Sequence, residues 1–261
     1  MSQWCRYQVQ LFCLAVSFFS RLPIPSSTPY SPERMNRAGR YFALVGTLLG
    51  LLCGLVFHLV EYALPSSVAV IVTMAFSLLL TGAFHEDGLA DMADGIGGGM
   101  TVERRLAIMK DSRLGTYGTV TLVLALMMKF SLLDELSNHT ALLAIFVLAY
   151  TYSRAVAASL ISAMPYVSDL DTSKSKPLAS TQTQQELAFL VFCGVLSSLI
   201  FGLTVALLLA VVAVLFRYLF IKWLTARLGG FTGDCLGAAQ QIMELLIYLV
   251  LLVYWSNGGG R

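Results

Sequence analysis

Long apolar runs separated by short polar segments set the pattern of this chain. A membrane-spanning helix needs roughly 20 apolar residues, and several stretches approach or exceed that length: residues 41–63, 66–84, 116–133, 140–163 and 235–255. A further run, residues 186–224, is too long for one helix across about 30 Å of hydrocarbon at 1.5 Å per residue, so we divide it near Gly202. The pattern predicts an all-α, polytopic membrane helix bundle of about seven transmembrane helices, in one membrane-embedded domain over residues 1–261.

A shorter apolar run, residues 9–19, precedes the first predicted span. It is too short to cross a bilayer, and the sequence RLPIP follows it in place of a small-residue cleavage pattern. We therefore expect a retained segment that lies at the membrane interface.

Lys and Arg residues recur in every second connection between the predicted spans. They precede the first span and follow the second, fourth and sixth, at Arg21, Arg34, Arg37, Arg40, Arg104, Arg105, Lys110, Arg113, Lys174, Lys176, Lys222 and Arg227. The alternate connections contain neither residue type. Because loops rich in Lys and Arg stay in the cytoplasm, we expect every long polar loop on the cytoplasmic side.

Composition agrees with a membrane protein and excludes a disordered chain. Hydrophobic residues make up 57% of the chain and charged residues 12%, against about 25% charged in a typical soluble domain, and the mean hydropathy is +0.75. The net charge of +2 gives no reason to expect a nucleic-acid partner. The five cysteines form no CxxC pair, so neither a disulfide framework nor a zinc site is predicted.

The placement of polar residues favours an enzyme over a transporter. Transporters place polar groups along a pathway at membrane depth and show related halves. This chain has no internal repeat, and its spans contain almost no acidic residues apart from Glu61 near an end and Glu244 in the last helix. A divalent-cation transporter, which would also use clustered carboxylates, is therefore the weaker alternative.

The connection after the second span carries the clearest chemical signal. If that span continues as a helix through HEDGLADMADG, then Asp87, Asp91 and Asp94 stand at i, i+4 and i+7 on one face. Each pair of like charges about 6 Å apart costs roughly 3 kcal/mol at an effective dielectric near 20, which favours a bound cation. Oxygen ligands favour Mg²⁺ or Mn²⁺. A solvated acidic face neutralised by nearby Arg and Lys residues is the alternative, and we expect Glu86 to be solvated and His85 to lie at the interface.

Two glycine-flanked acidic turns fall on the same predicted side of the membrane. One is DSRLGTYG at 111–118, where Arg113 and exposed amides suit a phosphate. It follows a short predicted helix that begins at the N-cap Thr101. The other is GGFTGDCLG at 229–237, where Asp234 is either a plain N-cap or part of a site assembled from separate loops.

Basic residues within the spans are the remaining candidates. Arg154 lies in the cytoplasmic half of the fourth span, where a charge costs roughly 2.5 to 3.5 kcal/mol, so we expect it to pair with a carboxylate or a phosphate. Lys129 and Arg217 are expected to snorkel to the membrane surface. Lys174 and Lys176 would contact phosphate or belong to a solvated loop.

The combined motifs resemble the cobalamin synthase family, the adenosylcobinamide-GDP ribazoletransferases of bacterial inner membranes. The resemblance covers essentially the whole chain and depends on FSRLPIP at 19–25, HEDGLADMADG at 85–95, MKDSRLGTYG at 109–118, and GGFTGDCLGAA at 229–239 followed by Glu244. One departure is that Tyr166 is followed by Val167-Ser168-Asp169, where many members have Tyr-Ala-Arg. If that Arg contacts nucleotide in relatives, the contact here would come from Lys174 and Lys176 or be absent.

The resemblance implies a Mg²⁺-dependent transfer in cobalamin biosynthesis, with Mn²⁺ as the alternative ion. A ribose hydroxyl of α-ribazole, or of its 5′-phosphate, attacks the cobinamide-bound phosphate of adenosylcobinamide-GDP, and GMP leaves. The product is adenosylcobalamin or its 5′-phosphate. The resemblance also implies a multi-pass protein of the inner membrane with a cytoplasmic active site in about residues 85–118, and other late cobamide-assembly enzymes as partners.

Under this resemblance the candidate site residues take specific roles. Asp87, Asp91 and Asp94 would hold the metal, with Asp91 and Asp94 also counted as catalytic. Asp111 and Asp234 would be further ligands or accept the hydroxyl proton, and Arg113 and Arg154 would offset phosphate charge.

A membrane phosphotransferase of the CDP-alcohol type is the nearest alternative. Its pattern Asp-x-x-Asp-Gly matches at Asp91, Asp94 and Gly95. Gly98-Gly99 then stands where that family has Ala-Arg, so only the opening of its motif is present.

Overall fold

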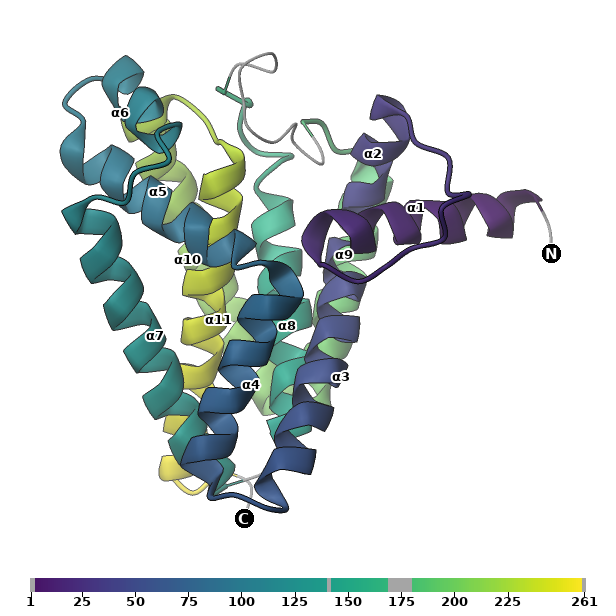
Figure 1. Ribbon diagram of the computed structural model, residues 1–261, viewed down its shortest axis with the longest axis vertical. Coiled ribbons are helices and arrows are strands. Elements are labelled where there is room, and N and C mark those ends of the chain that lie inside the picture. Colours follow the sequence, from purple (N-terminus) through teal and green to yellow (C-terminus); the bar gives the residue numbers. More distant parts are fainter. Residues whose placement is uncertain (1–2, 140–141, 169–179, 260–261) are drawn as a thin grey trace.

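The computed structural model describes residues 3–139, 142–168 and 180–259, and helices make up nearly all the regular structure of these residues. The long helices run roughly along one axis (Figure 1): α3 (Phe42–Glu61), α4 (Ser66–Thr81), α7 (Thr116–Ser137), α8 (Leu142–Ser159), α9 (Gln184–Ser198), α10 (Gly202–Leu228) and α11 (Gly233–Ser256). The predicted all-α, polytopic membrane bundle is confirmed.

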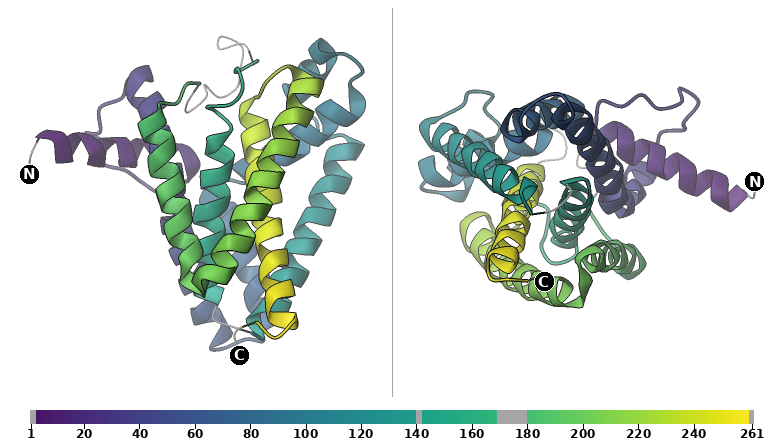
Figure 2. Two further views of the ribbon diagram at one scale, coloured as in Figure 1. Left: turned by 180° about the vertical axis from the view of Figure 1, so that it is seen from behind. Right: turned by 90° about the horizontal axis from the view of Figure 1, so that it is seen from below.

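The number of spans depends on one long apolar segment. Within the described residues, five helical segments are long and apolar enough to cross a membrane, or six if the bent pair α4 and α5 is one span. One of them, residues 184–228, breaks at Gly202, whose φ is +88°. Figure 2 shows α9 and α10 meeting at the lower end of the bundle and diverging toward its upper end. By length and composition the described residues thus give five or six spans, and the seventh span that the sequence predicts depends on counting α9, which has 15 residues, separately from α10.

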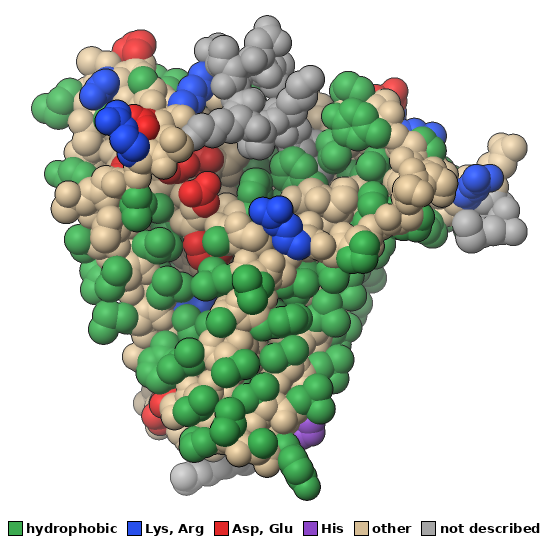
Figure 3. Space-filling model, viewed as in Figure 1, with side chains coloured by type: hydrophobic (Ala, Val, Ile, Leu, Met, Phe, Trp, Pro, Cys, Tyr) green, Lys and Arg blue, Asp and Glu red, His purple; other side chains and the backbone are tan. Residues whose placement is uncertain are grey.

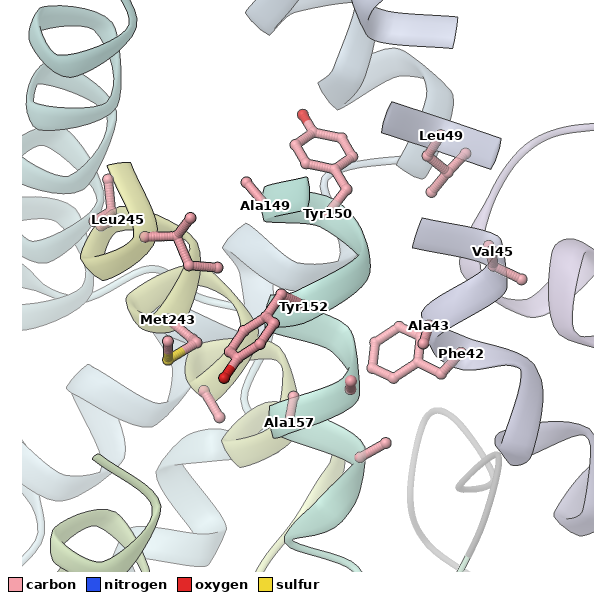
Figure 4. Packing of buried hydrophobic residues seen from close by; sticks show 14 of the residues in the cluster. Phe42, Ala43, Val45, Leu49, Ala149, Tyr150, Tyr152, Ala157, Met243 and Leu245 are labelled. Carbon is pink, nitrogen blue, oxygen red and sulfur yellow. The ribbon is translucent and has the colours of Figure 1, made fainter. Parts of the chain in front are cut away.

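Helix α8 forms the centre of the bundle. Its side chains Tyr150, Tyr152 and Ala157 lie between α3 and α11 (Figure 4), and all three are buried. Helix α3 approaches α8 through glycines, because a Cβ added at Gly46 would lie only 2.1 Å from the Tyr150 carbonyl oxygen. The apolar surface of the bundle faces outward below a charged upper end (Figure 3), as in a helix bundle surrounded by lipid.

The second span does not continue as a straight helix into the acidic motif. Helix α4 ends at Gly82 with φ +68°, and Ala83 follows with φ +55°. A left-handed residue other than glycine costs about 1 to 2 kcal/mol. The contacts of the packed fold must therefore offset the cost of this break. Helix α5 (Phe84–Gly98) starts after it at 85° to α4 and runs obliquely across the upper end of the bundle (Figure 1). The predicted continuous helix is therefore wrong, although the motif itself is helical.

The remaining helices lie at the same end. Helix α1 (Gln3–Phe19) projects sideways from the bundle (Figure 2), with Trp4 69% exposed, in the orientation expected of an interfacial segment. Helix α2 (Pro32–Ala38) and the short helix η1 (Gly39–Tyr41) lead into α3. Helix α6 (Val102–Met109) begins as predicted, because the Thr101 hydroxyl accepts a hydrogen bond from the Arg104 amide at 3.3 Å.

Candidate active site

An acidic cleft opens at the upper end of the bundle, between α5, α6 and the start of α11. Its cavity volume is about 100 Å³. Asp87 and Asp91 from α5, Asp234 from α11 and Lys110 from the end of α6 line it. The other lining residues are Phe84, Met109, Tyr166, Ser168, Thr232 and Gly233. The acidic residues from two distant parts of the chain thus meet in one cavity, as the hypothesis of a site assembled from separate loops requires.

Two glycines allow α5 and α11 to cross closely enough to build this cleft. A Cβ added at Gly88 would lie 3.0 Å from the Asp234 Cα, and one at Gly237 would lie 3.3 Å from the His85 carbonyl oxygen. Both positions therefore favour glycine, and the contact sets Asp234 beside the face of α5 that carries Asp87. Asp234 is not the N-cap of α11, because Thr232 has that place and its hydroxyl accepts from the Cys235 amide at 3.4 Å.

Loop contacts hold the far side of the cleft. Val167 donates its amide to the Phe231 carbonyl, and the Phe231 amide donates to the Pro165 carbonyl, both at 3.0 Å. This isolated bridge ties the segment after α8 to the loop between α10 and α11. Tyr166 and Thr232 therefore stand at fixed positions on the cleft wall.

Asp94 has a different environment from the other two aspartates of α5. Its side chain is 7% exposed, and its two carboxylate oxygens accept hydrogen bonds from the amides of Gly115 at 2.7 Å and Gly118 at 2.8 Å. These amides belong to the first turn of α7, where unpaired N–H groups and the helix dipole favour an anion. Asp94 thus caps α7 across the fold, and this use of both oxygens differs from the metal-ligand role that the helical spacing predicts.

Asp111 and Arg113 form an ion pair near the surface rather than in the cleft. The Arg113 Nη2 lies 2.7 Å from Asp111 Oδ2, and the arginine side chain is 88% exposed. The hydrogen bond and charge of Asp111 raise the pKa of Arg113 above its usual value. Neither residue lines the acidic cleft, although their neighbour Lys110 does.

Arg154 is buried in the core, with 2% of its surface exposed. Its guanidinium lies 4.9 Å from the centroid of the Tyr150 ring and 5.8 Å from that of Phe42, and Nη1 donates to the Tyr150 carbonyl at 3.1 Å. Among the described residues its Nε has no hydrogen-bond partner, and no carboxylate forms an ion pair with it. The expected pairing with a carboxylate is therefore not found. Lys174 and Lys176 lie outside the described residues.

The structure also contains a buried charged cluster that the sequence analysis missed. Lys129 of α7 lies 3.0 Å from Glu244 Oε1 of α11 and 3.9 Å from Glu86 Oε1 of α5. Gln241 joins them, because its Nε2 donates to Glu86 at 3.0 Å and its Oε1 accepts from Lys129 at 3.1 Å. The expectations of a solvated Glu86 and a snorkelling Lys129 are wrong. The available signal was the pair of opposite charges, Lys129 and Glu244, placed within two apolar spans.

The donor chemistry of the cleft suits a hard divalent cation held partly by substrate. Among the described residues, no group of three or more His, Cys, Asp or Glu side chains is arranged to hold a metal ion by itself. Mg²⁺, however, is usually bound through one or two carboxylates plus substrate phosphates and water. Asp87 and Asp91 lining one cavity fit that mode and do not fit an all-protein metal cage.

Fold and site together define a multi-pass membrane enzyme with a carboxylate-lined site at one end of its bundle. Residues 11–252 match the family model described as Cobalamin-5-phosphate synthase. Relatives that carry the name "Adenosylcobinamide-GDP ribazoletransferase" include proteins of three Vibrio species. The protein of Vibrio parahaemolyticus is 64% identical over 97% of this chain and 95% of its own length. The protein of Vibrio vulnificus is 66% identical over 97% of this chain and 98% of its own length. The protein of Vibrio cholerae is 58% identical over 98% of this chain and 98% of its own length.

The chain belongs to the cobalamin-5-phosphate synthase family, which confirms the resemblance inferred from its motifs. It is thus an enzyme of cobalamin biosynthesis, of the adenosylcobinamide-GDP ribazoletransferase type. This assignment displaces the CDP-alcohol phosphotransferase and the cation transporter. No solved structure matches the chain.

Proposed function

We propose that the acidic cleft joins α-ribazole, or its 5′-phosphate, to adenosylcobinamide-GDP with the help of Mg²⁺, for which Mn²⁺ is the alternative. The observation that carries this proposal is the meeting of Asp87, Asp91 and Asp234 in one cavity with Lys110. In the reaction, a ribose hydroxyl oxygen forms a bond to the cobinamide-bound phosphorus. The bond from that phosphorus to the oxygen shared with GMP breaks, GMP leaves with the bonding pair, and the hydroxyl proton passes to a base.

The roles of the cleft residues follow from their positions. Asp87 and Asp91, one turn apart on α5, would hold the metal, without Asp94, whose oxygens already bind the start of α7. Once bound, such an ion neutralises diphosphate charge and polarises a phosphoryl oxygen. Asp234 reaches the cleft from the other helix and is the proposed proton acceptor.

Basic residues near the cleft would offset the charge of the departing GMP. Lys110 lines the cavity, and Arg113 lies three residues further along the chain in its ion pair with Asp111. Phosphoryl transfer depends mainly on such positioning and charge neutralisation. Arg154 is left out of this set, because it is buried among aromatic rings in the core.

We further propose that the cleft faces the cytoplasm of a bacterial cell, from its inner membrane. The loops rich in Lys and Arg precede α3 and follow α5 and α10, at the same end of the bundle as the cleft. The positive-inside rule then assigns that end to the cytoplasm. Substrate and nucleotide would be exchanged with that compartment, where other late cobamide-assembly enzymes would also meet this protein.

The test is turnover by the purified protein in liposomes. Adenosylcobinamide-GDP, α-ribazole and Mg²⁺ are supplied, and GMP and cobalamin are measured by chromatography with and without EDTA. We expect equal amounts of both products, abolished by EDTA and by Asp91→Asn but retained by the control Asp134→Asn at the opposite end of α7. A folded wild-type sample that releases no GMP would refute the proposed reaction. Full activity of Asp91→Asn would refute the metal site alone.

A further inference from the structure

A second cavity, which we call the aromatic pocket, lies directly beside the acidic cleft. Its wall is formed largely by ring side chains, among them Phe19, Phe42, Phe84, His85, Tyr166 and Phe231. Phe84, Tyr166 and Gly233 line both cavities, so the two spaces adjoin. A molecule bound in the aromatic pocket would therefore have one end at the cleft.

His85 is a fully buried polar side chain in the lining of this pocket, which also includes Tyr166. It is 1% exposed, and within the described part of the chain its Nε2 has no hydrogen-bond partner. Its ring lies nearly parallel to those of Phe19 and Phe42, with interplanar angles of 12° and 9° and centroid distances of 6.1 and 5.8 Å. The phenyl ring of Phe84 meets it edge-on at 5.5 Å. Packing thus fixes the imidazole while leaving one ring nitrogen unsatisfied.

Such a site selects a narrow class of ligand. A buried donor or acceptor without a partner is costly, and a ligand that supplies the partner removes that cost. The remaining wall is mainly apolar and aromatic, which suits the faces and edges of a flat ring system. The cavity volume is about 40 Å³, so the surrounding rings have to part for a bicyclic base to enter. The fitting ligand is a planar, mainly apolar heterocycle with one hydrogen-bonding ring nitrogen.

We propose that the aromatic pocket binds the base of the nucleoside substrate and that His85 Nε2 donates a hydrogen bond to its free ring nitrogen. This inference rests on the proposed function, since it assigns a subsite to one of the two substrates. The dimethylbenzimidazole base of α-ribazole has two fused rings, two methyl groups and a single ring-nitrogen acceptor. Guanine instead presents O6, N7 and N2 groups, most of which would lose their hydrogen bonds in an apolar pocket.

The geometry also orders the reacting groups. With the base between the rings of the aromatic pocket, the ribose would emerge where Phe84 and Gly233 border both cavities. Asp234, the proposed proton acceptor, follows Gly233 directly and lines the cleft on that side. The nucleoside would then approach from the aromatic pocket, and the cobinamide diphosphate from the acidic cleft.

The test pairs one variant with one substrate analogue. We compare wild type and His85→Phe, using α-ribazole and the matching dimethylindole riboside, in which C–H replaces the acceptor nitrogen. For wild type we expect about tenfold weaker binding of the indole riboside, measured as KM and by equilibrium dialysis. For His85→Phe the KM for α-ribazole should rise about tenfold, the two nucleosides should become equivalent, and the KM for adenosylcobinamide-GDP should stay unchanged. His58→Phe, an exposed histidine in α3, is the matched control.

Several outcomes would overturn the assignment. One is a His85→Phe enzyme that still prefers α-ribazole by the wild-type factor, and another is a rise in the KM for adenosylcobinamide-GDP alone. If His85→Phe does not fold, photo-crosslinking of wild type with an azidobenzimidazole riboside decides. Label on the peptides of Phe19, Phe42 or Phe231 supports the pocket, and label elsewhere refutes it. Dialysis and crosslinking need no turnover, so a wild type that binds the nucleoside but releases no GMP would refute the proposed reaction without refuting the pocket.

Discussion

Replacing Asp94 by asparagine separates a structural from a metal-binding role for the third aspartate of α5. The native carboxylate accepts two hydrogen bonds, from the amides of Gly115 and Gly118 at the start of α7. An asparagine side chain has one oxygen and one NH₂ group, so it can satisfy only one of these amides. The other amide would lose its partner, and at Gly118 it would do so in a buried position.

The expected loss of stability can be worked from these contacts. A hydrogen bond to a charged group contributes about 1.5 to 3 kcal/mol, and a negative charge at a helix N-terminus about 0.3 to 1 kcal/mol. Asp94→Asn removes one such bond and the charge, so we expect the free energy of unfolding to fall by about 2 to 4 kcal/mol. The close approach of Asp94 also requires glycine at both amide donors. A Cβ added at Gly118 would lie only 2.4 Å from Asp94 Oδ2.

The assay is unfolding of the detergent-solubilised protein, followed by circular dichroism, together with the Mg²⁺ concentration that gives half-maximal activity. We expect Asp94→Asn to unfold more easily while its surviving activity keeps the wild-type Mg²⁺ dependence. Asp134→Asn serves as the control for charge loss in a membrane helix. Unchanged stability combined with a strongly raised Mg²⁺ requirement would refute the capping role and restore Asp94 as a ligand.

Other substitutions test the remaining parts of the site. Gly88→Val should lower kcat about a hundredfold, because its side chain would push α5 away from the Asp234 backbone and misplace reacting groups. Gly98→Ala on the same helix is the control. A Cβ added at Gly98 would contact only Ile108 Cδ1, at an ordinary distance of 3.5 Å, so kcat should stay unchanged in the same assay. Lys129→Met should lower the free energy of unfolding by about 3 to 5 kcal/mol, since it leaves two buried glutamates without their cation, and detergent unfolding curves would reveal it. Arg113→Ala should raise the KM for adenosylcobinamide-GDP severalfold with no change in unfolding temperature, because the side chain is exposed; an unchanged KM would exclude it from substrate binding.

The helices could be predicted from the sequence because hydrophobicity alone requires them. A chain segment inside the bilayer must satisfy its own backbone hydrogen bonds, so each apolar run of sufficient length becomes a helix. Gly202 could also be predicted as the break in the long run, since no single helix of that length fits the hydrocarbon. The short helix after Thr101 followed from local capping chemistry, which needs no tertiary information.

The sequence did not predict features that depend on distant partners. The bend before α5 requires Ala83 to adopt a left-handed conformation, which no local rule assigns to alanine. The capping role of Asp94 depends on α7, which begins more than 20 residues later. Glu86 could be interpreted as solvated because its burial depends on Lys129 and Gln241 from two other helices. Helical spacing shows which residues share a face, but only the packed fold shows what that face meets.

The bend explains how one short helix carries both anchoring and reacting carboxylates. At the start of α5, Glu86 points into the bundle and binds Gln241 and Lys129, while the adjacent Asp87 lines the cleft. Two turns further on, Asp94 accepts hydrogen bonds from two amides at the start of α7 and so fixes the later part of α5. The helix is thus held by a carboxylate at each end, and Asp87 and Asp91 lie between these anchors. Reacting groups held in this way need little rearrangement when charge develops, which is the condition under which fixed charges stabilise a transition state most effectively.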